Sequence, residues 1–269
     1  MVLSPTMQLY FARHAESFNN GLEGHADYYA RRKAEPGLTD RGRAQAAHLA
    51  ALVVGDAEHH SHACRHRLSR NPWNHEGFEI THMYCSFQRR AVETATIVAE
   101  ATDMDLVGWP DIHECGGVVD YDSADRKFHG AAGASASDLA AWSPGLIIDD
   151  TIDPDGWWGH RAMENRDGSA DRADRVYRKL LESHGGTDDR VLLVSHSMFY
   201  VFFICRVLNL PFTSELWFTL NNAALTRLDI GDGDDYEPGM DAGWQKLPGL
   251  PVRVTYMNRL DHLPVELVS

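Results

Sequence analysis

Short apolar runs alternate along the chain with longer stretches whose apolar residues recur every three or four positions. The first pattern is typical of strands buried on both faces, and the second of helices with one apolar side. Strands that alternate with helices predict an α/β fold, a three-layer sandwich with a mostly parallel central sheet and helices on both faces. The predicted strands span 7–12, 80–86, 105–109, 190–195, 224–230 and 252–257, and the predicted helices span 40–54, 88–102, 135–142, 169–184 and 197–208.

Three segments interrupt this alternation. Residues 55–77 form a polar insertion, residues from about 120 to 167 are rich in Gly, Asp, Ser and Ala, and residues from about 231 to 248 are acidic and rich in glycine. No internal repeat and no long linker separates the predicted elements. We therefore expect residues 1–269 to form a single domain in which the segment 120–167 is a lid or cap.

The charge balance limits the possible partners. The chain has 25 Lys and Arg residues against 39 Asp and Glu residues, which gives a net charge of −14. Nucleic acids and anionic membranes select an excess of Lys and Arg, so neither is an expected partner. An anionic substrate therefore needs a local cationic pocket. The chain also has 15 histidines, and imidazole serves as base, nucleophile or metal ligand.

Cysteine usage and hydropathy favour a soluble cytoplasmic protein. Cys64, Cys85, Cys115 and Cys205 are scattered without a Cys-x-x-Cys pair, which is typical of reduced thiols. The first residues lack the basic and apolar regions of a secretory signal. The apolar run at 198–205 is far shorter than the ~20 residues that a membrane span needs. Nothing in the sequence predicts an oligomeric state.

Candidate chemistry lies at the ends of three predicted strands. Arg13 and His14 follow the first strand, Ser86 and Arg90 follow the second, and His196 follows the fourth. In an open α/β sheet, ligands bind beyond the carboxyl ends of the strands, where helix N-termini also present N–H groups to anions. A single Arg-His pair is most often an ordinary surface feature, but its recurrence at three strand ends indicates a pocket for a compact dianion such as phosphate.

Five collinear motifs extend along the chain. They are RHAES at 13–17 with Asn20 beyond it, LTDRG at 38–42, SFQRRAVETA at 86–95, VSH at 194–196 and NNAALTRL at 221–228. Together they resemble the motifs of the histidine phosphatase superfamily, also called the phosphoglycerate mutase-like fold. Glu114 falls where that family carries its acid/base carboxylate, although without the flanking matches it would be interpreted as a solvated loop residue.

The resemblance implies a catalytic mechanism without a metal or other cofactor. Neutral His14 would attack phosphorus and form a phosphohistidine. Arg13 and Arg90 would keep His14 unprotonated and bind the phosphate oxygens bidentately, while His196 and Asn20 would donate further hydrogen bonds. The acid/base carboxylate would protonate the leaving oxygen and later take a proton from water. Because cations surround the phosphate, no metal is required.

Departures from the family motifs favour a phosphatase. Phe87 and Ser197 replace the usual proline and glycine, but neither change removes a reacting group. The Gly116-Gly117 pair stands where sugar-phosphate mutases carry Arg-x-Tyr-Gly. We therefore predict a phosphoric monoester hydrolase of the histidine acid phosphatase type, acting on a small phosphorylated metabolite. A phosphoglycerate-type mutase and a non-catalytic phospho-ligand-binding protein are the alternatives. The candidate substrate contacts are Arg126, Lys127, His129 and Trp158.

Two further patterns are interpreted as surface features. The five histidines and one cysteine between 59 and 75, namely His59, His60, His62, Cys64, His66 and His75, could bind zinc or copper. Their spacing matches no closed zinc site, which favours a solvated loop. The acidic stretch 231–241 lacks the spacing and the final glutamate of a calcium loop. The paired Trp157-Trp158 fits a lid over substrate and an anchor for the cap equally well.

Overall fold

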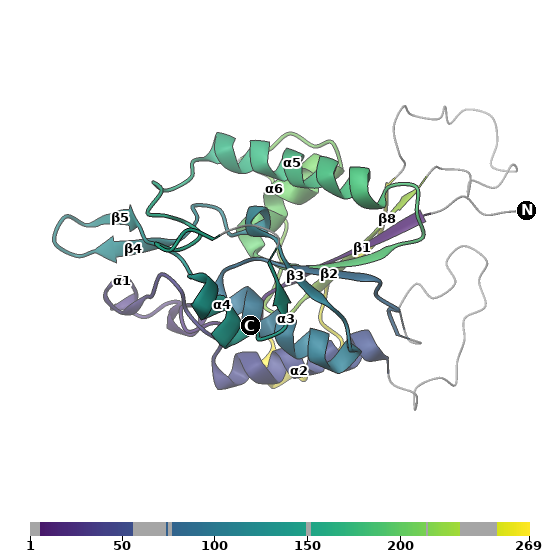
Figure 1. Ribbon diagram of the computed structural model, residues 1–269, viewed down its shortest axis with the longest axis horizontal. Helices are drawn as coiled ribbons and strands as arrows, with labels where there is room; N and C mark the ends of the chain where they lie inside the picture. Colours follow the sequence, from purple (N-terminus) through teal and green to yellow (C-terminus); the bar gives the residue numbers. More distant parts are fainter. Residues whose placement is uncertain (1–5, 56–73, 75–76, 149–151, 214, 232–251) are drawn as a thin grey trace, which may run out of the picture.

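The computed structural model describes residues 6–55, 74, 77–148, 152–213, 215–231 and 252–269. Its central sheet has seven strands in the order β6-β3-β2-β7-β1-β8-β9. The pairs from β6 to β1 are parallel, whereas β8 is antiparallel to both β1 and β9 (Figure 1). This architecture confirms the predicted α/β fold with a mostly parallel sheet. The strands are β1 Thr6–Arg13, β2 His82–Cys85, β3 Leu106–Gly108, β6 Leu146–Ile147, β7 Arg190–Ser195, β8 Leu225–Gly231 and β9 Val252–Arg259.

Helices cover both faces of the sheet. On one face α2 (Asp40–Val54) packs against α3 (Arg89–Thr102), and on the other α5 (Arg166–His184) packs against α6 (Ser197–Val207) (Figure 1). The smaller elements are η1 Asn20–Leu22, α1 Tyr28–Arg31, η3 Pro110–Ile112, β4 Val119–Asp122, β5 Lys127–Gly130, α4 Ala136–Trp142 and η4 Val265–Leu267.

The sheet separates two hydrophobic cores, and β1 contributes to both. Tyr10 and Ala12 lie in the core under α2 and α3, while Leu9 and Phe11 lie in the core under α5 and α6. Successive side chains of a strand point to opposite faces, so a strand covered on both sides needs apolar residues at every position. This double burial explains why the buried strands were predicted as continuous apolar runs.

Local capping explains which helix boundaries were predicted. The Thr39 hydroxyl accepts a hydrogen bond from the Gly42 amide at 2.9 Å, and the helix spans Asp40–Val54 as predicted. Helix α5 begins three residues earlier than predicted, at Arg166, because the Asn165 side chain accepts from the Gly168 amide at 2.9 Å. The first turn of α5 is polar, so it carries no apolar periodicity.

The segment 120–167, for which a lid or cap is predicted, contains a separate hairpin and one strand of the central sheet. Strands β4 and β5 form a separate antiparallel hairpin, which was not predicted. Strand β6, from the same segment, pairs with β3 and forms an edge of the central sheet. This strand was not predicted, because two residues are too few to give a sequence pattern. Most of the insertion 55–77 and of the excursion 231–248 lies outside the described residues.

Two other expectations concern the cysteines and the membrane. Within the described ranges, Cys85, Cys115 and Cys205 are free thiols. The helices in those ranges include none with the length and apolar character of a membrane span.

Candidate active site

Strands β1, β7 and β2 are neighbours in the sheet, and their carboxyl ends bring the predicted site residues together. Arg13 is in register with Ser195, and Cys85 is in register with Val194. The residues that follow these ends therefore meet at one edge. The rings of His14 and His196 lie 5.1 Å apart between centroids, tilted by 55°.

His14 is held as a neutral imidazole with its Nε2 lone pair directed into the site. Its Nδ1 lies 2.7 Å from the carbonyl oxygen of Ala15, which can only accept, so Nδ1 carries the proton. Nε2 in turn accepts from Nε–H of Arg90 at 3.1 Å. Burial, followed by the charges of Arg90 and Arg13, holds the pKa of His14 well below its usual range. The sequence predicted the effect of the arginines but not that of burial.

Arg13 and Arg90 are half-buried cations without a carboxylate partner in the described part of the chain. Arg13 donates from Nη1 to the carbonyl oxygen of Leu220 at 2.8 Å, while its buried Nε makes no hydrogen bond with the described residues. Within those residues, neither guanidinium has a carboxylate oxygen within ion-pair distance. Partial burial lowers the pKa of both arginines, although the more distant charge of Glu114 opposes this shift. Because an unpaired and partly desolvated charge is costly, this arrangement fits an anionic ligand.

His196 supplies a second polar group at the same place. It occupies the N-cap position of α6, and its Nε2 lies 2.9 Å from Oγ of Ser86. Ser86 Oγ also accepts from the Gln88 amide at 3.2 Å. With a second lone pair and its own proton, this hydroxyl can pair with either tautomer of His196. Nδ1 of His196 is buried without a partner among the described residues. Burial and the Arg90 charge hold the pKa of His196 well below its usual range, so the ring is neutral.

Glu114 is not a solvated loop carboxylate. Its Oε1 accepts from the backbone amides of Cys115 at 2.9 Å and Phe199 at 3.0 Å, and its Oε2 accepts from the Met198 amide at 3.4 Å. The amides of Met198 and Phe199 belong to the first turn of α6, whose dipole favours a carboxylate at this end. The chain after β3 therefore delivers Glu114 to the helix terminus that His196 caps.

Gln88 connects this carboxylate loop to Arg90. Its Oε1 accepts from the Glu114 amide at 2.9 Å and from Nη2 of Arg90 at 3.2 Å. Its Nε2 donates to the carbonyl oxygen of Gly117 at 3.2 Å. Gln88 was not predicted as a site residue, because a glutamine two positions before Arg90 belongs to no recognisable sequence motif.

Asn20 and Asn222 support the backbone around His14. Asn20 Oδ1 accepts from the Ser17 amide at 3.1 Å and from its hydroxyl at 2.8 Å, and its Nδ2 donates to Glu23 at 2.9 Å. Asn222 donates to the carbonyl oxygen of His14 at 3.0 Å and to Asn20 Oδ1 at 3.4 Å. Asn222 was missed as a site residue although it lies in the motif at 221–228.

The candidate substrate contacts lie farther out. Arg126, Lys127 and His129 are exposed residues of the β4–β5 hairpin, and His129 Nε2 lies 2.7 Å from Asp125 Oδ2. Trp158 is 4% exposed, and its Nε1 donates to the carbonyl oxygen of Arg161 at 2.8 Å. In the described part of the chain, no hydrogen bond or ion pair joins these four side chains to Arg13, His14, Arg90 or His196.

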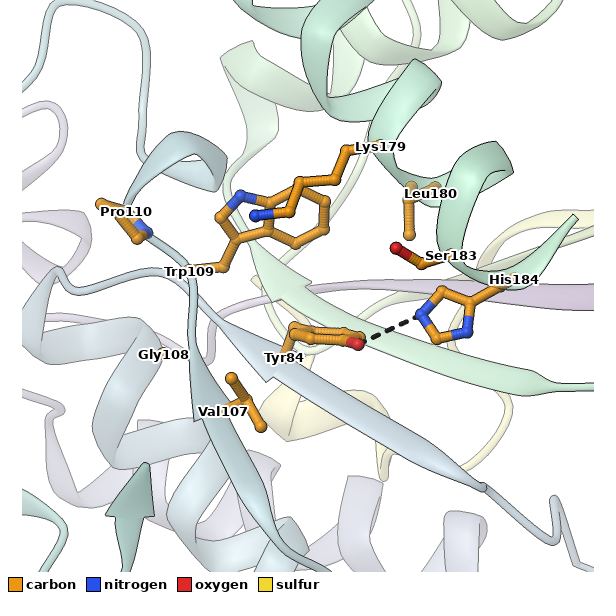
Figure 2. A pocket seen from close by; sticks show the side chains of 9 residues that line it. All are labelled: Tyr84, Val107, Gly108, Trp109, Pro110, Lys179, Leu180, Ser183 and His184. Atoms are coloured by element: carbon orange, nitrogen blue, oxygen red, sulfur yellow. Dashed lines mark hydrogen bonds between the residues drawn. The ribbon is translucent and has the colours of Figure 1, made fainter. Parts of the chain in front are cut away.

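A cavity of about 270 Å³ lies elsewhere, between α5 and the strands β2 and β3 (Figure 2). Arg13, His14, Arg90 and His196 do not line it. Its lining residues are Tyr84, Val107, Gly108, Trp109, Pro110, Lys179, Leu180, Ser183 and His184.

Comparisons with known proteins agree with the fold. The family model "Histidine phosphatase superfamily (branch 1)" matches residues 58–237, a range that begins after the Arg13-His14 motif. No curated protein matches the chain. Among solved structures, a mycobacterial glucosyl-3-phosphoglycerate phosphatase is 20% identical, with 94% of this chain and 99% of that chain covered and a TM-score of 0.53.

Two further structures are similar over almost their full lengths. A phosphoserine phosphatase mutant from Entamoeba histolytica, in complex with phosphoserine, is 15% identical, covers 96% of this chain and 100% of its own, and has a TM-score of 0.55. A mycobacterial hydrolase is 18% identical, with coverages of 94% and 91% and a TM-score of 0.54. At these identities the likeness establishes the fold alone.

Proposed function

Since the chain belongs to the histidine phosphatase superfamily (branch 1), with 58–237 matched, we propose that it hydrolyses a small phosphomonoester through a phosphohistidine on His14. The observation that carries this proposal is the pair of half-buried arginines, without carboxylate partners among the described residues, beside a neutral histidine. A dianionic phosphate would neutralise both cations and pair with two nitrogens that lack partners there, Arg13 Nε and His196 Nδ1.

In the first step, Nε2 of His14 attacks phosphorus, so an N–P bond forms while the ester P–O bond breaks. The guanidiniums of Arg13 and Arg90 bind the transferring oxygens, which neutralises charge as positively charged groups do in other phosphoryl-transfer sites. The carboxylic acid of Glu114 gives its proton to the leaving ester oxygen. The alcohol product departs, and His14 carries the phosphoryl group.

In the second step, water attacks the phosphohistidine. The Glu114 carboxylate takes a proton from the water while the new P–O bond forms and the N–P bond breaks. Inorganic phosphate leaves, and His14 returns to its neutral form with Nε2 free. The hydrogen bonds from the first turn of α6 fix the position of the Glu114 carboxylate for both transfers.

The substrate class is inferred from the size and charge of the site. One pair of arginines suits one phosphate group, and the acidic exterior disfavours polyanions. Two of the similar structures are named as phosphatases of glucosyl-3-phosphoglycerate and of phosphoserine, which are small phosphorylated metabolites. These names support a small phosphomonoester as the class of substrate.

The test combines steady-state turnover with detection of the intermediate. Para-nitrophenyl phosphate is supplied in the presence of EDTA, and rapid alkaline quenching is used to detect phosphohistidine. Wild-type protein is expected to release phosphate and to form an acid-labile phosphoenzyme. His14→Ala is expected to lose both, and His48→Ala, on α2, serves as the matched histidine control. Wild-type turnover by His14→Ala, or turnover abolished by EDTA, would contradict the proposal.

A further inference from the structure

We propose that His82, His184 and Asp189 form a binding site for a divalent transition metal such as Zn²⁺. His82 begins β2, His184 ends α5, and Asp189 directly precedes β7. The amino ends of the parallel strands β2 and β7 lie at one edge of the sheet, opposite the edge that carries His14. This site is thus separate from the proposed phosphatase chemistry and independent of it.

The ligand atoms are spaced for a single ion. Nδ1 of His184 lies 2.8 Å from Oδ2 of Asp189, and Nδ1 of His82 lies 3.9 Å from the same oxygen. One ligand atom from each residue falls within 4.8 Å of the other two. Tetrahedral zinc, with bonds of about 2.0–2.2 Å, needs ligand atoms roughly 3.3–3.6 Å apart. The two observed distances lie on either side of this value, so small side-chain rotations would complete the site.

The second nitrogen of His184 is already held in place. The Tyr84 hydroxyl lies 3.1 Å from Nε2 of His184, and Figure 2 shows this hydrogen bond beside the cavity between β2 and α5. Metal-ligating histidines commonly engage their other nitrogen in such a bond, which fixes the ring and the tautomer. With a metal on Nδ1, the proton of His184 resides on Nε2 and is donated to the Tyr84 oxygen.

Charge and access also suit a cation. The Asp189 carboxylate, which lies next to both imidazoles, supplies the negative charge that a cation requires. The His184 side chain is 5% exposed and the His82 side chain is 41% exposed. An ion can enter from the His82 side and keep a water molecule as its fourth ligand.

A simple His184–Asp189 ion pair accounts for only part of this arrangement. It does not account for the position of His82, whose ring lies 4.6 Å from that of His184. Nδ1 of His82 lies 3.9 Å from the same carboxylate oxygen and 2.9 Å from Oγ1 of Thr81, so metal binding would replace the contact with Thr81. Two imidazoles and one carboxylate form a donor set that favours zinc, copper or nickel over magnesium or calcium. Bound metal would connect β2, α5 and the start of β7, and would stabilise the folded chain by mass action.

The test measures bound Zn²⁺ per chain after stripping with a chelator and equilibrium dialysis. The histidines between 59 and 75, which lie outside the described residues, can bind zinc themselves, so the readout is the difference between variants. We expect His82→Ala and Asp189→Asn each to bind one equivalent less than wild type. His48→Ala is the matched control and should bind as many equivalents as wild type. Equal stoichiometry in all four proteins would overturn the proposal.

A second measurement protects the test against misfolding. His82 is largely exposed, so His82→Ala should fold normally and show a wild-type circular dichroism spectrum. Saturating Zn²⁺ should raise the melting temperature of wild type by about 5 °C or more and that of His82→Ala by less. An identical thermal response in both proteins would count against the site. Because turnover is assayed with EDTA, neither outcome bears on the phosphatase proposal.

Discussion

The two ends of the parallel strands each carry a pair of neighbouring histidines, but the charged groups beside the two pairs are of opposite sign. At the carboxyl end, His14 and His196 lie 5.1 Å apart between ring centroids. At the amino end, His82 and His184 lie 4.6 Å apart. The first pair is buried beside two arginines, whereas the second shares one aspartate and is partly open to solvent.

The difference shows that neighbouring charges select the chemistry of an imidazole pair. Burial and the arginine charges disfavour imidazolium, so His14 is held neutral, as the proposed nucleophile must be. The carboxylate of Asp189 instead makes the other pair suitable for a cation. Each of the following predictions changes one feature that distinguishes the two ends.

Removal of His14 should have the largest effect. Without Nε2 no N–P bond can form, so His14→Ala should lower kcat by at least about 10³-fold and abolish the phosphoenzyme. Its Zn²⁺ stoichiometry should remain that of wild type, because the metal ligands lie at the opposite edge. Rapid quenching and equilibrium dialysis on the same preparation measure both effects. A loss of bound zinc in this variant would show that the two ends are not independent.

Substitution of Arg90 should separate geometry from charge. Arg90→Lys keeps the charge but loses the planar fork and the Nε contact with His14, so kcat/KM should fall about 10²-fold. Arg89→Lys is the matched control, because Arg89 pairs with Glu93 at 2.7 Å outside the site. Its activity should stay within about twofold of wild type. A similar loss in both variants would mean that the Arg90 fork has no special role.

The same arginine should also set the acid limb of the pH profile. The nucleophile must be neutral, and the pKa of His14 lies well below its usual range, so wild-type kcat/KM should persist well below pH 6.5. Arg90→Gln removes one cause of that shift while burial remains. The acid limb should therefore move to higher pH in Arg90→Gln but not in Arg90→Lys. An unmoved limb in Arg90→Gln would indicate that burial alone sets the pKa.

The sequence predicted those parts of the molecule that rest on local periodicity or on sheet geometry. Continuous apolar runs identified the buried strands because both sheet faces are covered. The convergence of His14, Arg90 and His196 followed from the rule that parallel strands end at one edge. Strand β6 was not predicted because two residues carry no periodicity. The β4–β5 hairpin was not predicted because most of its residues are exposed.

The contacts that the sequence did not predict depend on how distant elements pack. Tyr84 and His184 are 100 positions apart and meet only because α5 ends beside the start of β2. Gln88 reaches the Glu114 amide through the path of the loop after β3. Neither the distance along the chain nor the residue type signals these contacts, so only the folded arrangement shows them.

The two ends of the sheet also differ in how a carboxyl group affects the pH dependence of stability. The groups compared are Glu35, near Arg90, and Asp189 at the amino end. Oε2 of Glu35 accepts from the Arg89 amide at 3.0 Å, while its buried Oε1 has no hydrogen-bond partner among the described residues. Burial raises the pKa of Glu35 to about 7. The folded state then holds the proton between about pH 4.5 and 7 while the unfolded state releases it, so stability falls as pH rises through this window.

Glu35→Gln should therefore stabilise the protein by about 1–3 kcal/mol at pH 8 and by little at pH 4. Asp189→Asn should do the opposite at pH 8, because the lowered pKa of Asp189 gives stability above its unfolded pKa that is lost as pH falls. Urea unfolding at both pH values, with EDTA present, measures these effects. Destabilisation by Glu35→Gln at pH 8 would show that the ionised carboxylate is well accommodated beside Arg90.

The smallest effect is expected from Tyr84, which touches the metal ligands without binding the ion. Tyr84→Phe removes the hydroxyl that holds Nε2 of His184 but keeps the ring against Trp109, 5.4 Å away. Zn²⁺ affinity should fall about tenfold, as is typical when the hydrogen-bond partner of a metal ligand is lost. Competition with a chromophoric chelator measures this change. Tyr121→Phe, on the β4–β5 hairpin, is the matched control.

Unchanged affinity in Tyr84→Phe would show that Tyr84 does not orient His184 as a metal ligand. The expected tenfold loss would instead assign the proton of metal-bound His184 to Nε2. At the carboxyl end, His14 holds its proton on Nδ1 against the Ala15 carbonyl and leaves Nε2 unprotonated, where it accepts from Nε–H of Arg90. The two ends would then differ in tautomer as well as in charge, since at each end the hydrogen bond to one nitrogen decides which atom of the ring is free to react or to bind.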